Sequence, residues 1–230
     1  LVAVPVGMIL YRTFAPGIPQ FLSWVRTPAA ISATNLTMAI VAIVVPLNVA
    51  FGVLTAIALV RWRFPGRRLL QAAVDLPFAV SPVVVGVSLI MLWGAGGWFG
   101  GLAGHGVAVI FSIPGMVLAT MFVTLPFVVR EVEPVLREMG TEQEQAAATL
   151  GASGWQTFWR VTLPAIRWGL TYGIVLTVAR ALGEFGAVVM VSSGIPGVSQ
   201  TLTLLVHSRY IDDHNTYGAY AAATLLMAVA

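Results

Sequence analysis

Residues 34–60 read TNLTMAIVAIVVPLNVAFGVLTAIALV and contain no Asp, Glu, Lys, Arg or His. A helix of about 20 apolar residues crosses the roughly 30 Å hydrocarbon core of a bilayer, so this stretch predicts a transmembrane helix. Further apolar segments lie at residues 69–93, 107–129 and 171–193, with shorter ones at 1–14 and 217–230. We therefore expect an all-α integral membrane protein with about six transmembrane helices.

The composition supports the same fold class. The chain is 58% hydrophobic and 9% charged, whereas roughly 25% of residues are charged in an average soluble domain. So few charges cannot cover a water-facing surface, and lipid must replace water around most of the chain. We expect one transmembrane domain over residues 1–230, with both ends trimmed, because the chain begins without Met and stops inside an apolar run.

Two missing residue types limit the chemistry of these residues. Without Cys there is no disulfide, thiolate metal site or cysteine nucleophile, and without Lys there is no P-loop to hold nucleotide phosphates. The arginines are spread among loops without a contiguous basic face, which argues against nucleic-acid binding. We expect no catalytic site, no metal site and no cofactor held by the chain itself, so any ATP hydrolysis belongs to a partner.

The arginines also predict the orientation in the membrane, since positively charged loops remain in the cytoplasm. Residues 61–68 and the 130–170 segment carry four arginines each, and these two loops lie on the same side of a six-helix count. The opposite side carries only Arg12, Arg26 and Arg209. Both arginine-rich loops and both termini are therefore expected in the cytoplasm.

The 130–170 segment is the one long polar interruption, and long loops between membrane helices usually have a function. Thr141 followed by Glu144 predicts a capping box at the start of a short helix. Residues 146–148 are alanines with high helix propensity and little bulk, and Gly151 predicts a left-handed stop.

A second short helix should follow directly. Ser153 and Gln156 repeat the capping pattern, and Pro164 fits the first turn of the next helix. The two short helices, joined at Ala152, would form an elbow. Interfacial helices that rest on lipid usually carry Lys or Arg on their polar face, whereas this elbow begins with acidic residues and has small alanine side chains in its middle. We expect it to dock into a protein groove.

The spacing of this segment resembles the signature loop of ABC importer permeases. Gln145, Ala146 and Ala147 are followed by Gly151, then nine residues, then Val161-x-Leu163-Pro164. The resemblance implies a coupling helix that enters a cleft of a cytoplasmic ATPase. The residues assigned to it are Glu144, Gln145, Ala146, Ala147, Gly151, Val161, Leu163 and Pro164. Gln145 stands where the motif has glutamate, which puts an ion pair from that position in doubt.

Other strings resemble the sulfate/molybdate branch of that family and, within it, W-type sulfate/thiosulfate permease subunits. They lie at residues 64–67, 75–82, 114–120, 125–131, 167–170, 180–187 and 191–194. The resemblance implies a bacterial cytoplasmic (inner) membrane protein that forms half of a pore with a related T-type subunit. Two ATPase subunits, which bind ATP and Mg²⁺, and an extracytoplasmic sulfate-binding protein would complete the importer.

Four residues are candidates for the substrate pathway or its gate: Ser81, Pro82, Arg180 and Glu184. Arg180 and Glu184 lie four apart in the 171–193 span, which would place them on one helix face. A charge at membrane depth costs at least ~2.5–3.5 kcal/mol, so each needs a partner or water. They form either a structural pair or gate, or a transient attraction for an oxyanion balanced by a carboxylate.

Two further polar groups have alternative interpretations. Asp75 would pair with an arginine of the neighbouring loop or, more simply, stabilise a helix start. His207 and His214 with Asp212 and Asp213 invite a metal interpretation, but the spacing matches no zinc pattern, and a solvated loop that meets the binding protein is favoured.

Three alternative functions stay open at this stage. A molybdate or tungstate ABC permease would share the motifs above. An ion-coupled secondary transporter would use midplane charges, but the capped elbow would then be unexplained. A membrane hydrolase would need a base beside a nucleophile, and all three histidines lie outside the predicted spans.

Overall fold

The computed structural model describes residues 3–101 and 109–230, and every regular element among them is helical. Three helical stretches are long and apolar enough to cross a membrane: α3 (Pro28–Arg61), α6 (Ile113–Met139) and the stretch Gly154–Leu182, which ends in α9 (Leu163–Leu182). The pair α4 (Arg67–Ala79) and α5 (Pro82–Trp93) meets the same criteria as one broken span. The all-α membrane fold is confirmed, and with the short apolar helices α1 (Ala3–Phe14) and α12 (Thr216–Val229) it is consistent with about six membrane segments.

The remaining helices are short. One precedes α3 and one follows α6. Two form the start of the Gly154–Leu182 stretch, and three lie between α9 and α12. They are α2 (Ile18–Val25), α7 (Glu142–Thr149), α8 (Gly154–Thr157), the π-helical turn η2 (Phe158–Thr162), α10 (Gly186–Val191), α11 (Leu202–His207) and the π-helical turn η3 (Ser208–Asp212).

The described chain divides into two compact units, which share the long helices α3, α6 and α9. The first unit combines segments from the beginning, middle and end of the chain: Leu1–Ile43, Ser81–Thr120 and Ala181–Ala230. The second combines Val44–Val80 with Met121–Arg180. Each unit has its own buried core.

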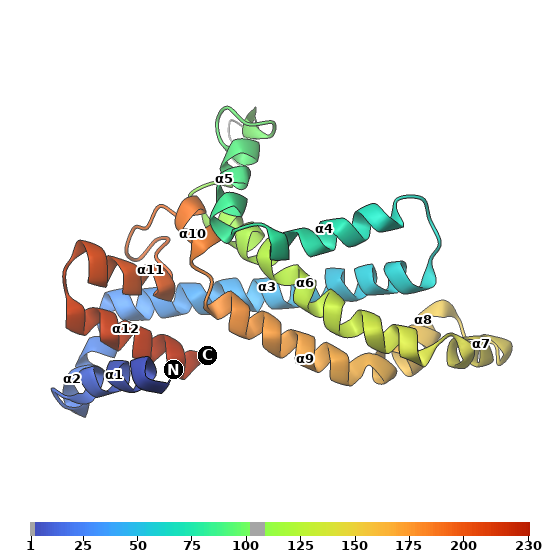
Figure 1. The fold of residues 1–230 in the computed structure, drawn as a ribbon, viewed down its shortest axis with the longest axis horizontal. Helices are drawn as coiled ribbons and strands as arrows, with labels where there is room; N and C mark the ends of the chain where they lie inside the picture. The colour runs from blue at the N-terminus through green and yellow to red at the C-terminus, as the bar shows by residue number, and fades with distance from the viewer. Residues whose placement is uncertain (1–2, 102–108) are drawn as a thin grey trace. The chain divides into compact units, whose positions relative to one another are not determined.

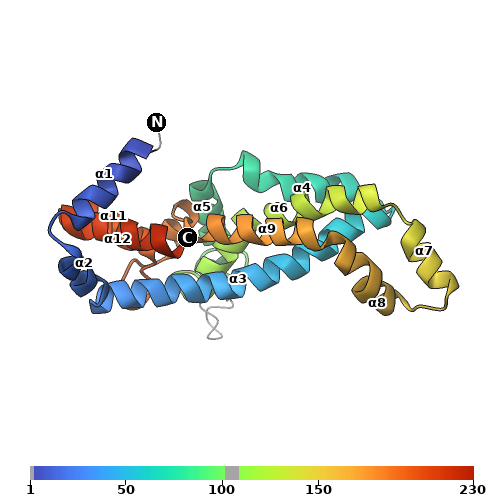
Figure 2. The ribbon, with the colours of Figure 1, turned by 90° about the horizontal axis from the view of Figure 1, so that it is seen from below.

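The core of the second unit lies between four helices that run side by side (Figure 1, Figure 2). It contains residues from α3, α4, α6 and α9, among them Leu59, Val74, Val128, Leu136 and Ile166. Gly52 of α3 faces α6 so closely that a Cβ there would lie 2.7 Å from Val128 Cβ. A small residue at such a close contact is typical of packed membrane helices.

The first unit packs α1, α2, α11 and α12 around the start of α3. Its core contains Ala33, Leu202, Leu205 and Ala222, and Trp24 packs against it. A second contact joins α5 to α10, where a Cβ on Gly86 would lie 2.6 Å from Met190 Cβ. Glycine at this position lets the two helices approach closely.

Three predicted spans need new boundaries. The 69–93 segment breaks at Val80 and Ser81, whose ψ angles of 135° and 136° are extended, because Pro82 disfavours helical geometry in the preceding residue. The 171–193 segment breaks after α9, before α10 begins at Gly186. The 107–129 span corresponds to α6 from Ile113 onward, and residues 107 and 108 lie outside the described part of the chain.

The polar 130–170 segment is also less of a loop than predicted. Its first ten residues continue α6 as far as Met139, and the chain turns only at Gly140, which has φ +65°. Charged residues in this part of α6 therefore lie on a helix that extends the span.

Candidate functional site

The short helix α7 does not begin with the predicted capping box. Thr141 is its N-cap residue, but the Thr141 side chain makes no capping hydrogen bond. Gln145 Nε2 instead donates to Thr141 Oγ1 at 3.1 Å. The prediction was wrong because Glu144 has a stronger partner elsewhere.

Glu144 joins α7 to other helices of the second unit. Arg61 Nε lies 2.9 Å from Glu144 Oε2, and Arg61 Nη2 donates to Glu144 Oε1 at 3.3 Å. Thr162 Oγ1 donates to the same Oε1 at 2.8 Å. Charge-assisted hydrogen bonds of this kind are stronger than neutral ones, so Glu144 is held as an internal anchor and faces away from the exposed side of α7.

The end of α7 is a Schellman motif, as the glycine predicted. Gly151 has φ +84°, its N–H donates to Ala148 O at 3.0 Å, and the Ala152 N–H donates to Ala147 O at 3.1 Å. These bonds satisfy carbonyls that a helix end otherwise leaves open. Leu150 beside the turn is 88% exposed.

The second half of the elbow begins with the capping box that the sequence predicts. Gln156 N–H donates to Ser153 Oγ at 3.3 Å, and Ser153 N–H donates to Gln156 Oε1 at 2.9 Å. Trp155, Phe158 and Trp159 then pack ring against ring, with centroids 5.5–6.2 Å apart. This cluster stiffens the junction between α8 and η2.

The outer surface of the elbow is available for docking. No residue of α7 is buried. Ala146, Ala147 and Leu150 line a groove whose other wall carries Arg160 and Arg167 from η2 and the beginning of α9. The arrangement offers a smooth apolar floor beside two cations, a surface that fits another protein better than lipid tails.

The structure brings the predicted coupling residues into one elbow. Val161 belongs to η2, while Leu163 and Pro164 open α9, where Leu163 packs on the core of the second unit. The motif therefore runs from an exposed helix to the buried base of a spanning helix. It spans the residues Glu144, Gln145, Ala146, Ala147, Gly151, Val161, Leu163 and Pro164.

Ser81 and Pro82 lie at the break between α4 and α5. Ser81 is the N-cap residue of α5 and makes no side-chain capping bond, and Pro82 occupies the first turn. Proline fits that position because its missing N–H has no helical partner there. These residues shape the break.

Arg180 and Glu184 do not share a helix face, so that premise was wrong. Arg180 lies in the last turn of α9, where a cation is favoured by the helix dipole. Glu184 follows the end of α9, is 2% exposed, and its Oε1 accepts from the Ala187 N–H at 2.7 Å. The carboxylate therefore acts as the capping side chain at the start of α10.

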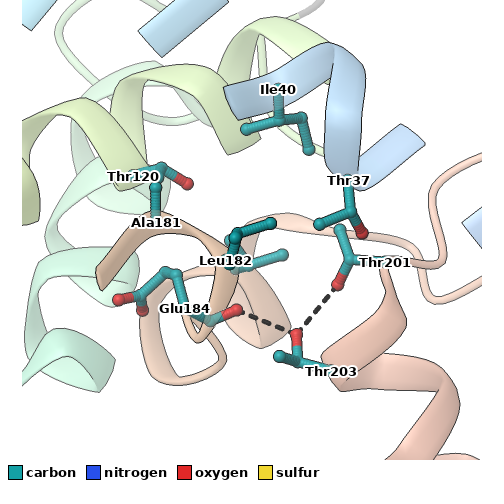
Figure 3. A pocket seen from close by; sticks show the side chains of 9 residues that line it. Thr37, Ile40, Thr120, Ala181, Leu182, Glu184, Thr201 and Thr203 are labelled. Atoms are coloured by element: carbon teal, nitrogen blue, oxygen red, sulfur yellow. Dashed lines mark hydrogen bonds between the residues drawn. The ribbon is translucent and has the colours of Figure 1, made fainter. Parts of the chain in front are cut away.

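Glu184 lines a small pocket in the first unit, whose wall mixes apolar side chains with threonines (Figure 3). Thr203 Oγ1 donates to Glu184 O at 2.8 Å and lies 3.0 Å from Thr201 Oγ1. The pocket holds about 10 Å³, which suffices for roughly one water molecule. A space this small, with a glutamate and apolar side chains in its wall, does not hold a divalent oxyanion in this conformation.

Asp75 pairs with an arginine, as one alternative predicted, but with one of α6 and not of the 61–68 loop. It lies inside α4, 2.7 Å from Arg130 Nη2 of α6. The guanidinium also lies over the Phe78 ring, 5.7 Å from its centroid. Arg130 was expected at the start of a loop and instead lies within α6.

The histidine and aspartate cluster before α12 is largely helical. His207 ends α11 with its ring 5.2 Å from that of Phe185, and Arg209 Nη1 bonds Asp213 Oδ2 at 2.8 Å. Within residues 3–101 and 109–230, no group of histidines and carboxylates is arranged to hold a metal ion.

The sequence did not identify two residues that bond Glu144 of the elbow. Arg61 was counted only for orientation, although it is the last residue of α3, and Thr162 was not singled out. A cation at the end of a predicted span is a weak signal of a helix-end contact. Nothing local in the sequence points to Thr162.

Comparison with known proteins identifies the family. The family described as binding-protein-dependent transport system inner membrane component matches residues 48–230. This chain belongs to that family. Members are membrane components of transport systems, in agreement with the helical fold.

Curated relatives cover nearly the whole chain. Sulfate permease 2, chloroplastic, of Chlamydomonas reinhardtii is 51% identical over 100% of the chain, which spans 62% of that relative. The sulfate transport system permease protein CysW of Synechocystis is 49% identical over 99% of the chain and 82% of the relative. The CysW protein of Escherichia coli K12 is 48% identical over 100% and 79%.

A solved structure shares the fold at low sequence identity. It is a bacterial alginate ABC transporter in complex with an alginate-bound periplasmic protein, with a TM-score of 0.80 and 16% identity. The match covers 98% of this chain and 82% of the other.

Proposed function

We propose that this chain is a W-type permease subunit of an ATP-driven sulfate importer and forms half of its pore. The similarity to CysW proteins over nearly the whole chain supports this proposal. Permeases named cysT, such as that of Nephroselmis olivacea, are more distant at 40% identity. A T-type subunit is therefore the proposed second half of the pore.

The observation that carries the coupling role is the exposed, capped helix α7. Its alanines and the following Leu150 line an open groove, while Glu144 fixes the helix from the inner side. In this proposal, two partner ATPases bind ATP and Mg²⁺ and receive α7 in a cleft. An extracytoplasmic binding protein delivers the substrate.

The contact between Arg61 and Glu144 supports the proposed orientation. Arg61 begins the arginine-rich 61–68 loop and Glu144 belongs to the elbow, so the two segments lie on the same side of the membrane. Their combined arginines favour the cytoplasm. Both termini would then lie on the cytoplasmic side of a bacterial inner membrane.

Transport by the complete complex tests the proposal. The chain, a T-type subunit, the ATPase and the binding protein are reconstituted in vesicles, and uptake of labelled sulfate is measured with and without ATP. We expect ATP-dependent uptake that excess sulfate or thiosulfate inhibits. Inhibition by molybdate or tungstate alone would favour the molybdate branch, and uptake driven by an ion gradient without ATP would contradict the proposal.

A further inference from the structure

Among the side chains of α7, Glu144 makes the ion pair and hydrogen bonds that reach other helices. The helix has eight residues, and a helix this short is marginal in water without tertiary contacts. The side-chain bonds of Gln145 and Thr149 stay within its own segment. Those of Glu144 reach two other elements, α3 and η2.

Arg61 extends this attachment to α6. Its Nη1 donates to the Leu136 carbonyl at 3.1 Å. That carbonyl belongs to the last turn of α6, where helix carbonyls lack intrahelical partners and the dipole favours a cation. Arg61 is also the last residue of α3, so one guanidinium joins the ends of two spanning helices to α7.

Burial makes the contact specific. The side chains of Arg61 and Glu144 are 11% and 20% exposed, and Thr162 is 5% exposed. Removing one partner of this partly buried charged pair leaves the other with less water and no opposite charge to compensate it. The Arg61–Glu144 contact is therefore stabilising only while α7 keeps its position against α3 and η2.

We propose that the Arg61–Glu144 pair transmits displacement of α7 to the ends of α3 and α6, and so keeps ATP hydrolysis tied to substrate movement. Arg61 and Glu144 are positioning residues in this proposal, which rests on the proposed function. The pair leaves the exposed groove of α7 unchanged. Its loss should uncouple the transporter without releasing the ATPase.

The test measures the ratio of sulfate uptake to ATP hydrolysed in vesicles that contain the complete transporter. Arg61→Gln and Glu144→Gln should each lower this ratio about fivefold or more, the lower end of typical coupling energies between sites. The ratio of the double variant should be no lower than that of the single variant with the lower ratio, because both changes break the same interaction. Arg61→Lys, which keeps a cation but not the planar fork, should fall between wild type and Arg61→Gln.

Arg137→Gln is the matched control. It removes an arginine that pairs with Glu133 four residues away on the same helix, α6, so this pair transmits nothing between elements. Its ratio should equal that of wild type.

Several outcomes would overturn the proposal. An unchanged ratio in both single variants, additive losses in the double variant, an equal loss in Arg137→Gln, or loss of ATPase co-purification would each do so. If Arg61→Gln fails to accumulate, Glu144→Gln and Arg61→Lys decide by the same criteria. Absence of ATP-dependent uptake by wild type would instead contradict the proposed function itself.

Discussion

Glu144 and Glu184 have each other's expected roles: the predicted capping residue forms an ion pair, and the predicted membrane charge caps a helix. Glu144 follows a threonine at capping-box spacing, yet it pairs with Arg61 at 2.9 Å. Glu184 lies in an apolar run like a pathway charge, yet it accepts the Ala187 N–H at 2.7 Å and caps α10. A carboxylate accepts hydrogen bonds from the strongest donors close to it, and the fold determines which donors those are.

The largest effect is expected at the buried carboxylate. Glu184→Ala should lower the free energy of unfolding by about 1–3 kcal/mol, because it leaves the buried Ala187 N–H without its acceptor. Glu184→Gln keeps an acceptor oxygen and should cost less. Thermal unfolding of the purified protein in detergent measures both, and equal stability of Glu184→Ala and wild type would contradict the capping role.

The next effect concerns the turn after α7. Gly151→Val should cost about 1–2 kcal/mol of local strain, because φ +84° is unfavourable for a side chain. A Cβ there meets no atom within 4 Å, so the strain comes from the backbone alone. The variant should insert normally but lose ATPase association or uptake.

Gly154→Ala is the control for that turn. A Cβ at Gly154 also meets nothing within 4 Å, and its φ lies outside the left-handed region. Its ATPase association should remain that of wild type. Equal behaviour of the two variants in a co-purification assay would refute the strain argument.

The two predicted capping boxes give a smaller, paired effect. Ser153→Ala should lose about 1 kcal/mol, a typical value for a capping side chain. Thr141→Ala should lower the free energy of unfolding by only a few tenths of a kcal/mol, because it removes only the hydrogen bond from Gln145. The order reverses if Thr141 is the true cap, and unfolding measurements on both variants distinguish the cases.

The smallest effect is expected at Asp75→Asn. The Asp75 and Arg130 side chains are 36% and 51% exposed, and exposed ion pairs contribute about 0–1 kcal/mol. Stability measured at low and high salt should differ little between this variant and wild type. A loss comparable to that of Glu184→Ala would show that the pair is buried in the assembled transporter.

The features that the sequence predicted correctly are local. The stop at Gly151 and the cap at Ser153 depend on residues within one turn, so spacing alone identifies them. The long apolar run of α3 is equally self-contained. These features gave the membrane class, the elbow and the residues on its exposed face.

The features that were wrong depend on distant partners or on competing local signals. Arg61 lies 83 residues before Glu144 in the chain, and no local pattern connects them. The break around Glu184 is hidden because apolar residues continue on both sides of it. Charges in the last part of α6 suggested a loop, although polar residues are compatible with a helix that leaves the membrane.

In the proposed function, the alanine face of α7 couples a sulfate permease to its ATPase. Ala147→Trp places bulk in the groove, whereas Thr149→Trp places it on another side of the same helix, outside the groove lining. ATP-dependent sulfate uptake by vesicles with equal amounts of either variant is the direct measurement. We predict that Ala147→Trp abolishes uptake and that Thr149→Trp retains it, and full uptake by Ala147→Trp would contradict the claim.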